Sequence, residues 1–368
     1  MRRKNKIFLT IIGSITLFTW ILTFYTPFCN SYRKNIYPTI NLILQTITGG
    51  CPIAIGELIM FAAFAFLLMG IILPILLLFP RKRGKIKGYL PHYLRILLNS
   101  IVIFLFVHTF TWVIPYRASS GSIETNASYE YSFEDVLKVR NYVILRLNEL
   151  CRELERDSGQ IIADNLDARI QEALRKASNE FPNLKGGYAP IKPAICSEIL
   201  NILSIGGYNY PYTMEPTVPR NLPPCTYCVC AAHEWVHNKG YYREIDGVYI
   251  SMLALTQSGD DVLEYFALYQ FLDKFLDSML LSSLPENLSY DELMDIEMEM
   301  EDPLETDFFF RDIYYFMENK IEYNAWDNDY ETLGISSPGW TVQDKINQKS
   351  SYQYAGPLLL NYYLGLCE

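Results

Sequence analysis

Three long apolar runs dominate the first third of the chain. Residues 7–25, 58–79 and 96–114 are almost free of charge, and each has about the length that a helix needs to cross a roughly 30 Å hydrocarbon core. No small-residue cleavage site follows the first run, so we expect it to remain as an anchor instead of being removed as a signal peptide. The pattern predicts three transmembrane helices and a multi-pass protein in contact with the lipid bilayer.

Beyond residue 115 the apolar positions follow a shorter, amphipathic pattern. Ser132 and Asp135 have the spacing of a capping box, which predicts a helix running towards Glu155, and a second helix is expected over about 166–180. Eight prolines and four glycines between 181 and 224 favour loop or short edge strand. We therefore predict a mainly α fold, with a mostly helical domain after the membrane helices.

The basic residues indicate how the chain is oriented in the membrane. Four cations lie within residues 2–6 and six within 81–95, whereas the loop between the first two spans holds Arg33 and Lys34 alone. The positive-inside rule then places the N-terminus in the cytoplasm and everything after the third span outside. We predict a membrane domain at 1–115 and an extracytoplasmic domain at 116–368 in the cytoplasmic (cell) membrane.

The acidic residues are concentrated in the predicted exported domain. Residues 1–115 contain 12 of the 31 basic residues and Glu57 as their one acid, which leaves 19 basic and 40 acidic residues in the rest of the chain. A domain with a formal charge of −21 repels the phosphate backbone. Nucleic acid is therefore not an expected partner.

One short motif carries candidate chemistry. His233 and His237 are four residues apart, so on a helix both side chains project from one face and can bind a zinc ion. Glu234 is then placed to act as general base on a zinc-activated water. A five-residue HExxH pattern also arises by chance. The small number of histidines in the chain and the glycine that follows the motif, Gly240, nevertheless favour zinc binding over a pair of histidines with a structural role.

The third zinc ligand must come from beyond the motif helix. On an unbroken helix Glu244 would lie about 10 Å further along the axis than His237, too far for ligands at about 2.0–2.2 Å from one ion. The chain is therefore expected to turn at Gly240 and to begin another helix near Glu244. Glu244 is the preferred third ligand, and Asp246 is the alternative.

Several other residues are candidates for supporting roles. Tyr241, Tyr242 or another nearby tyrosine is a candidate to stabilise the oxyanion. Cys225 and Cys228 have CxxC spacing, which suggests a second metal site, although buried thiols or disulfides are favoured because no matching pair follows. Zinc peptidases often hold an extended peptide along an edge strand, and the region 181–224 is placed before the motif as such a strand would be.

These stretches together resemble a known family. Tyr37-Pro38, Gly56-Glu57, Pro211 to Glu215 and His233 to Glu244 are similar to a bacterial membrane protein family known as domain of unknown function 3810. The resemblance covers nearly the whole chain and implies three N-terminal spans followed by an HExxH domain. Val248 departs from the family pattern, which has Asn at that position, and this weakens any polar role there.

The resemblance has implications for the site and for function. The Arg243-Glu244 pair resembles the glutamate-liganded zincins, or gluzincins, which supports Glu244 and a zincin-like domain. Glu215 is a candidate to bind a substrate amine or to orient a zinc-ligating histidine, or else it is a turn-stabilising or solvent-facing carboxylate. We expect a membrane-anchored zinc metallopeptidase acting on peptide or cell-envelope amide bonds. The alternative is a non-catalytic, zinc-stabilised envelope sensor or assembly protein that binds peptide in the same pocket.

Overall fold

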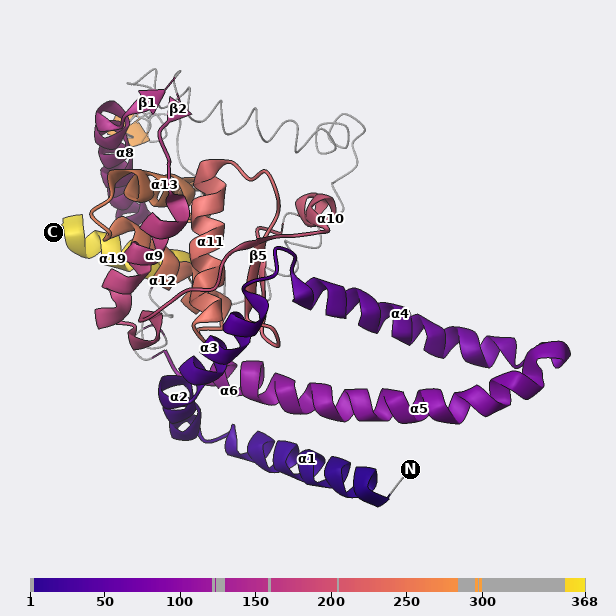
Figure 1. Ribbon diagram of the computed structural model, residues 1–368. Coiled ribbons are helices and arrows are strands. Elements are labelled where there is room, and N and C mark those ends of the chain that lie inside the picture. Colours follow the sequence, from indigo (N-terminus) through magenta and orange to yellow (C-terminus); the bar gives the residue numbers. More distant parts are fainter. Residues whose placement is uncertain are drawn as a thin grey trace. The chain divides into compact units, whose positions relative to one another are not determined.

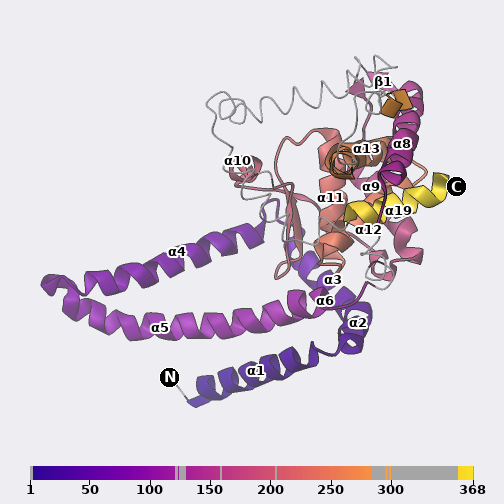
Figure 2. The ribbon, with the colours of Figure 1, turned by 180° about the vertical axis from the view of Figure 1, so that it is seen from behind.

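The chain is mainly helical (Figure 1, Figure 2). The computed structural model describes residues 3–120, 123, 130–157, 160–203, 205–283, 295–296, 298–299 and 355–367. The chain divides into two compact units, of which the first combines Met1–Ser119 with Asn209–Glu215. The second unit consists of Ser120–Tyr208 and Pro216–Glu368. The predicted boundary after residue 115 did not include the short segment Asn209–Glu215 in the first unit.

The first unit contains long apolar helices that pack side by side. They are α1 (Arg3–Leu22), α4 (Ile55–Leu76) and α5 (Pro80–His108), the last extended by a π-helical segment η1 (Thr109–Val113) and by α6 (Ile114–Tyr116). Helix α5 packs against both α1 and α4. Large apolar side chains such as Phe18, Phe64 and Leu98 are exposed on these helices, as expected where lipid covers the surface in place of protein.

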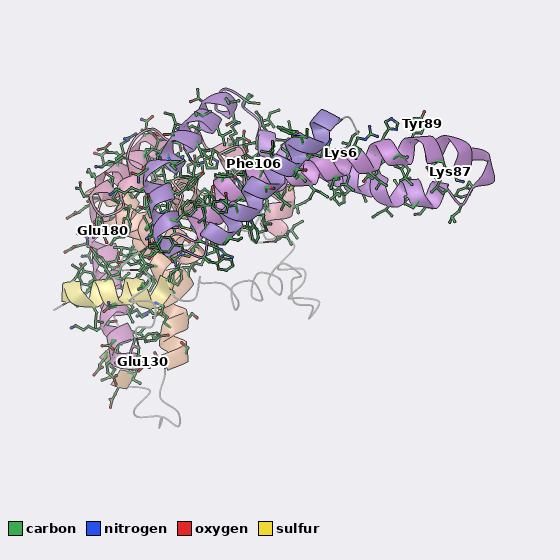
Figure 3. The ribbon with its side chains drawn as sticks, turned by 90° about the horizontal axis from the view of Figure 1, so that it is seen from below. Lys6, Lys87, Tyr89, Phe106, Glu130 and Glu180 are labelled. Atoms are coloured by element: carbon green, nitrogen blue, oxygen red, sulfur yellow. The ribbon has the colours of Figure 1, made fainter. Side chains whose placement is uncertain are left out.

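Three helices of the described residues are long and apolar enough to cross a membrane. These candidate spans are Asn5–Leu22, Ile55–Leu76 and Ile86–Tyr116, so the predicted number is confirmed but the predicted ends were wrong by several residues. The second span begins earlier than residue 58 because Glu57 is fully buried in the first turn of α4. The third begins before residue 96 because the helix continues through the polar stretch that contains Lys87 and Tyr89, near the turn that joins α4 to α5 (Figure 3).

The connection between the first two spans is also helical, which the apolar pattern did not predict. It contains α2 (Thr26–Asn35) and α3 (Tyr37–Thr48), each with a proline in its first turn, where the missing N–H of proline has no intrahelical partner to lose. Helix α2 packs against α3 and α6. The hydroxyl of Tyr32 donates to the carbonyl of Phe110 at 2.8 Å. This connection is therefore a packed part of the first unit.

The second unit is built around helix α11 (Pro224–Asn238). Helix α11 packs against α9 (Leu166–Lys176), α12 (Glu244–Thr256) and α13 (Asp261–Phe271). Around this group lie α8 (Phe133–Glu153), η4 (Leu272–Leu276), α14 (Asp277–Ser283) and α19 (Ala355–Cys367). The capping box that starts α8 is confirmed, since Ser132 Oγ accepts from Asp135 N at 3.2 Å and Ser132 N donates to the carboxylate at 2.9 Å.

The region before α11 holds short strands and turns, as its prolines predict. After the turns η2 (Ala177–Asn179) and η3 (Pro182–Leu184) come β3 (Lys192–Pro193), α10 (Ser197–Ile202), β4 (Tyr208–Tyr210) and β5 (Glu215–Val218). The strand order is β3-β5-β4, with β3 parallel to β5 and Lys192 opposite Thr217. A separate antiparallel pair joins β1 (Arg156–Asp157) to β2 (Gln160–Ile161).

The core of the second unit fixes the position of α11. Trp235 is fully buried, its ring packs edge-on against Tyr188, and its indole N–H donates to the carbonyl of Ala189 at 2.7 Å. Ala231, Ala232 and Val236 are also fully buried. Because closely packed neighbours surround these side chains, the helix has little freedom to slide or rotate.

Candidate metal centre

The two motif histidines lie on one face of α11. His233 and His237 are one helical turn apart, and their ring centroids are 4.3 Å from each other at an interplanar angle of 83°. Both side chains are largely buried, with exposed fractions of 15% and 8%. The spacing in the sequence thus brings the two imidazoles together as predicted.

A turn after α11 brings the next helix back towards the histidines. Gly240 has a φ of +96° and donates its N–H to the carbonyl of His237 at 2.9 Å. This left-handed conformation favours glycine because a Cβ would clash with the backbone. Helix α12 starts four residues later at Glu244. The prediction that the chain turns at Gly240 is confirmed.

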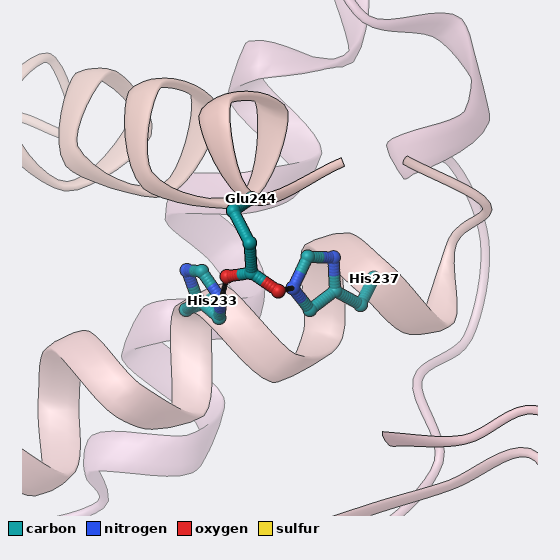
Figure 4. A group of neighbouring side chains, drawn as sticks. All are labelled: His233, His237 and Glu244. Carbon is teal, nitrogen blue, oxygen red and sulfur yellow. Dashed lines mark ion pairs between the residues drawn. The ribbon is translucent and has the colours of Figure 1, made fainter. Parts of the chain in front are cut away.

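Glu244 reaches from the first turn of α12 into the space between the imidazoles (Figure 4). Its carboxylate oxygens lie 3.2 Å from His233 Nε2 and 3.6 Å from His237 Nε2. One ligand atom from each of the three residues falls within 4.8 Å of the others. The Glu244 side chain is 46% exposed, so the cluster opens to solvent on the carboxylate side.

These separations fit the donor set of a zinc site. Tetrahedral ligands at about 2.1 Å from an ion are separated from each other by about 3.4 Å, and the two carboxylate–imidazole distances of 3.2 and 3.6 Å lie on either side of this value. Two imidazoles and a carboxylate are also the ligand types of the His2Glu catalytic zinc sites, which leave a fourth position for water. His233, His237 and Glu244 are therefore the candidate ligands of a metal ion.

A backbone hydrogen bond orients the ring of His237. Its Nδ1 lies 2.7 Å from the carbonyl oxygen of Tyr241. A carbonyl can only accept, so Nδ1 carries the proton and Nε2 faces Glu244. Metal-ligating histidines usually donate their second ring nitrogen to a carbonyl or carboxylate in this way.

The charges of the cluster favour a cation. Burial alone raises the pKa of Glu244, but hydrogen bonds from His233 and His237 hold it well below its usual range, so the carboxylate is ionised. Burial lowers the pKa of His233, and neighbouring His237 lowers it further. Burial opposes the charge on His237, yet the carboxylates of Glu244 and Glu234 raise its pKa to about 9. The site thus attracts positive charge, which a divalent ion can supply in place of a proton.

Glu234 lies on α11 beside the cluster but outside the ligand group. It is 4% exposed, and its Oε2 has no hydrogen-bond partner among the described residues. Burial raises its pKa to about 8, with a smaller contribution from Glu244 and partial compensation by His237. A buried carboxyl without a protein partner costs folding energy, so a water or substrate group is the expected partner of this oxygen.

Gly247 allows α12 to approach both histidines closely, a role that the sequence analysis did not assign. A Cβ at this position would lie 2.6 Å from His233 Cε1 and 2.8 Å from His237 Cε1. Real Cβ atoms do not approach neighbours this closely, so a side chain here would push the imidazoles or the helix aside. The signal was a glycine three residues after Glu244, on the same face of α12.

Gly207 plays a similar part beside Glu234. A Cβ there would lie 2.9 Å from Glu234 Cγ and from Oε1, and at the preceding Gly206 it would lie 2.6 Å from Cys230 Sγ. The two glycines let the backbone just before β4 pass directly against the motif helix. The sequence analysis placed the region 181–224 near the site but did not single out these residues.

Asp246, the alternative third ligand, has other partners. It is 1% exposed and accepts from Ser120 Oγ at 2.6 Å and from Arg243 Nε at 3.2 Å. Among the described residues, the candidate ligand group contains Glu244 and not Asp246. The carboxylate of Asp246 instead ties the start of α12 to the segment before α8.

The rings of Tyr241 and Tyr242, the two tyrosines of the turn, have different neighbours. The ring of Tyr242 stacks parallel to that of His237, with centroids 6.2 Å apart. The ring of Tyr241 packs edge-on against Phe181 in the core, and its carbonyl is the acceptor for His237. Both side chains are buried, with exposed fractions of 4% and 7%, and their role as oxyanion donors stays a prediction.

The cysteines of α11 do not join the metal cluster. The described residues contain one group of three candidate ligands, and no cysteine belongs to it. Cys225 is buried and lies 3.6 Å from the carbonyl of Phe266. Burial raises the pKa of Cys230 to about 12, which disfavours the thiolate that metals bind. Cys225 and Cys228 are buried free thiols and Cys230 is a half-buried free thiol, which agrees better with the favoured interpretation as thiols than with a second metal site.

Glu215 lies in the segment that groups with the first unit. It is 1% exposed, and its two oxygens accept from the backbone N–H groups of Ile55 and Gly56 at 3.0 and 2.7 Å. The solvent-facing alternative is therefore wrong, because the carboxylate is buried. Its predicted roles toward a substrate amine or a zinc-ligating histidine stay predictions.

Comparison with known proteins gives one match. The sequence model of a family described as "Protein of unknown function (DUF3810)" matches residues 32–318. No curated protein and no solved structure matches the chain. The matched range includes α4, α5, the strands β4 and β5, and the whole of the His233, His237 and Glu244 cluster.

Proposed function

Because the chain belongs to the DUF3810 family, whose description names no activity, we propose a function from the site itself. The second unit is a zinc-dependent peptidase domain that three membrane helices tether outside the cytoplasmic membrane. One observation carries this proposal: ligand atoms of His233, His237 and Glu244 converge within 4.8 Å beside the buried, unbonded Oε2 of Glu234. This is the arrangement that metal-assisted hydrolysis requires.

Each residue of the site has a separate task in the proposed reaction. Zinc, when bound, acts as a Lewis acid that lowers the pKa of a coordinated water towards about 7 and polarises a carbonyl. Glu234 Oε2 accepts the proton of the attacking water and then passes it to the leaving amine. His237 is held for coordination by its bond to Tyr241 O, and Gly247 keeps α12 close enough for Glu244 to reach the same point.

The backbone beside Glu234 supports a peptide as the substrate class. The backbone of Gly207 passes so close to Glu234 that a Cβ on this glycine would lie 2.9 Å from Glu234 Cγ. An extended peptide placed along this segment would bring its amide groups next to the general base, as in recognition by strand addition. Peptide or cell-envelope amide bonds are therefore the proposed substrates.

The proposed location outside the cytoplasm rests on charge. Four of the first six residues are basic, six more cations lie within 81–95, and the second unit has a large excess of acids. Lys6 lies near the start of α1 and Lys87 near the turn between α4 and α5 (Figure 3). Both lie at the first residues of candidate spans, Asn5–Leu22 and Ile86–Tyr116, at the ends that the positive-inside rule assigns to the cytoplasm.

Metal analysis of the full-length protein in detergent micelles tests the zinc site. We expect about one zinc ion per chain, as in other His2Glu sites, and a loss of this zinc in His233→Ala. His92→Ala is the matched control, because His92 is exposed on α5 and distant in sequence from the cluster. Equal zinc content in the wild type and His233→Ala would contradict the proposal.

Glu234→Gln tests catalysis apart from binding. The variant keeps the size of the side chain and leaves the ligands intact, so zinc content should be unchanged while cleavage of a peptide library falls by about 10²- to 10⁴-fold. If the wild type binds zinc but cleaves no peptide, the domain is better described as a zinc-stabilised binding protein of the envelope.

A further inference from the structure

One side of helix α3 turns polar side chains towards the protein. Four of them recur at intervals of three or four residues and therefore share a face of the helix, which we call the polar stripe: Tyr37, Asn41, Gln45 and Thr48. The first, second and fourth are 1%, 3% and 5% exposed, and the third is half-buried. Within the first unit, the hydroxyl of Tyr37 donates to Met214 Sδ at 3.3 Å and that of Thr48 donates to the carbonyl of Thr213 at 3.0 Å. The polar stripe is thus bound by residues of its own unit.

The opposite side of α3 presents apolar side chains to the surroundings. Leu42, Ile43 and Ile47 are 56%, 54% and 70% exposed, and we call these three residues the apolar face. Thr46 lies among them and donates its hydroxyl to the carbonyl of Leu42 at 2.6 Å, so this donor needs no water. No residue of α3 carries a charge. In water, an amphipathic helix turns its apolar side to the core, and α3 has the reverse arrangement.

Helix α8 of the second unit shows the arrangement that is expected in water. Its residues Val136, Val139 and Val143 are fully buried. Its charged residues Glu134 and Lys138 are exposed. The two helices belong to one chain, so the reversal in α3 needs a local cause, and apolar surroundings on its outer side supply one.

Contacts within the first unit indicate the level in the membrane at which α3 lies. It packs against η1, which falls inside the candidate span Ile86–Tyr116. Three residues connect α1 to α2, and six connect α3 to α4, so the two short helices remain close to the ends of these spans. In both views α3 lies at the span ends that are opposite to the turn between α4 and α5, and it is oblique to the spans (Figure 1, Figure 2). This is the level of the membrane interface.

The helix before α3 carries charge of one sign. Helix α2 ends with Arg33 and Lys34, and it contains no acidic residue. Lys34 is exposed. Basic side chains beside an apolar face are typical of helices that lie in the interface, because the cations attract the phosphate of lipid head groups.

We propose that α3 is an interfacial membrane helix, whose apolar face lies among the acyl chains of the adjacent leaflet while the protein binds its polar stripe. The connection between the first two spans is then a further lipid contact of the first unit and not a loop in water. This inference goes beyond the proposed function and does not depend on the zinc site.

Hydroxyl-radical oxidation of the wild-type protein tests whether water reaches the apolar face. The full-length protein is placed in nanodiscs of phosphatidylcholine and phosphatidylglycerol, and oxidation is measured by mass spectrometry of its peptides. Leu42 on α3 and Leu145 on α8 are a matched pair, with exposed fractions of 56% and 51%. We expect Leu42 to be oxidised about tenfold more slowly, because acyl chains exclude the water in which the radicals form. Equal rates would overturn the proposal.

Photo-crosslinking identifies what covers the apolar face. The photoreactive residue p-benzoylphenylalanine, incorporated in place of Ile47, replaces a side chain that is 70% exposed, so its larger ring has room. After illumination in the same nanodiscs we expect a phospholipid adduct, with a yield within about threefold of that from the same replacement of Phe64 on α4. Phe64 is 63% exposed and lies in a candidate span. The same replacement of Leu145 is the control and should give no lipid adduct.

Two outcomes of the crosslinking experiment would overturn the proposal. Crosslinks from position 47 to the second unit or to another copy of the chain, in place of lipid, would show that protein covers the apolar face. A lipid adduct at position 64 without one at position 47 would show that α3 lies outside the bilayer. The oxidation experiment uses the wild type, so it gives an answer even where a replacement prevents folding.

Discussion

Helices α4 and α12 are both rich in apolar residues, but different surroundings cover them. On α4, Leu58, Phe64 and Leu67 are 47%, 63% and 55% exposed, whereas on α12 Leu253 and Leu255 are 3% and 0% exposed. The helices have 22 and 13 residues, so they are about 33 and 20 Å long at 1.5 Å per residue. The longer one matches the thickness of a bilayer core. Length and apolar content together distinguish a candidate membrane span from a helix covered by protein, since α8 has 21 residues but is too polar to be a candidate span.

The comparison also extends to polar side chains. In the first unit, Trp20 donates its indole N–H to Thr109 Oγ1 at 2.9 Å, and in the second unit Trp235 donates to Ala189 O at 2.7 Å. Trp20 is 39% exposed and Trp235 is fully buried. The same chemical group thus makes one bond at a lipid-facing surface and one in a closely packed core.

The largest expected difference concerns leucine truncation. Leu255→Ala should lower the free energy of unfolding of the second unit by about 2–5 kcal/mol, because it leaves a cavity in a closely packed core. Leu67→Ala on α4 should change stability by less than about 0.5 kcal/mol, since lipid fills the space that the side chain leaves. Denaturant unfolding in micelles, followed by tryptophan fluorescence, measures both. Equal effects would mean that α4 is covered by protein.

Two glycine-to-alanine substitutions test the close approach of α12 to His233 and His237. Gly247→Ala places a methyl group against both imidazoles, so we expect zinc affinity to fall about 10- to 100-fold, as when the support of a ligand is disturbed. Gly13→Ala on α1 is the control, because a Cβ there meets nothing within 4 Å. Competition with a chelator measures the affinity. Wild-type affinity in Gly247→Ala would show that α12 can move away at little cost.

An ion pair in the second unit should make its stability depend on pH. Burial raises the pKa of Asp260, but hydrogen bonds from Arg169 and from the first amides of α13 outweigh this, and the net pKa lies below its usual value. A lowered folded pKa stabilises the fold above the unfolded pKa of about 3.9. This stability is lost as the pH falls through the lower folded value.

Asp260→Asn isolates this contribution. The variant keeps a capping side chain but loses the charge, so we expect a loss of about 1–2 kcal/mol at pH 7. The difference from the wild type should shrink as the pH falls below about 4. Denaturant unfolding of both proteins at a series of pH values measures it. A difference that stays constant over this range would assign the effect to the cap and not to the ion pair.

The smallest expected effect is that of Trp20→Phe. The substitution removes the bond to Thr109 within the first unit, and interhelical bonds of this kind contribute about 0.6 kcal/mol on average in a membrane. Trp235→Phe should cost more because it leaves the carbonyl of Ala189 without its donor in a buried place. Thermal unfolding in the same micelles compares the two. A larger loss of stability in Trp20→Phe than in Trp235→Phe would show that the bond in the first unit contributes more than the bond in the core of the second.

Local patterns in the sequence predicted much of the helical structure and the way in which His233, His237 and Glu244 come together. The apolar runs indicate the three candidate spans because a bilayer imposes a minimum length. The four-residue spacing of His233 and His237 determines that they share a face. The turn at Gly240 followed from the reach of a metal ligand, which required Glu244 to come back towards the histidines.

Contacts between distant segments were not predictable from local patterns. Nothing in the sequence distinguishes Gly207 and Gly247 from other glycines. Their importance comes from tertiary packing, which places them against Glu234 and the imidazoles. The helices between the first two spans, α2 and α3, also make contacts with distant residues, such as the bond from the hydroxyl of Tyr32 to the carbonyl of Phe110. The ends of the spans shifted because burial of Glu57 lets α4 start earlier than its apolar run.

The hydrogen bonds from the first amides of α4 to Glu215 also have a consequence for biosynthesis. Ile55 and Glu215 are separated by 160 residues, so at about 5–20 residues per second the ribosome adds the carboxylate about 8–30 s after the amides that it binds. During this interval the nascent chain has already supplied all three apolar helices to the insertion machinery. The amides of Ile55 and Gly56 therefore obtain their acceptor only after Glu215 has been synthesised. Maturation of the membrane helices thus depends on a part of the chain that is made later.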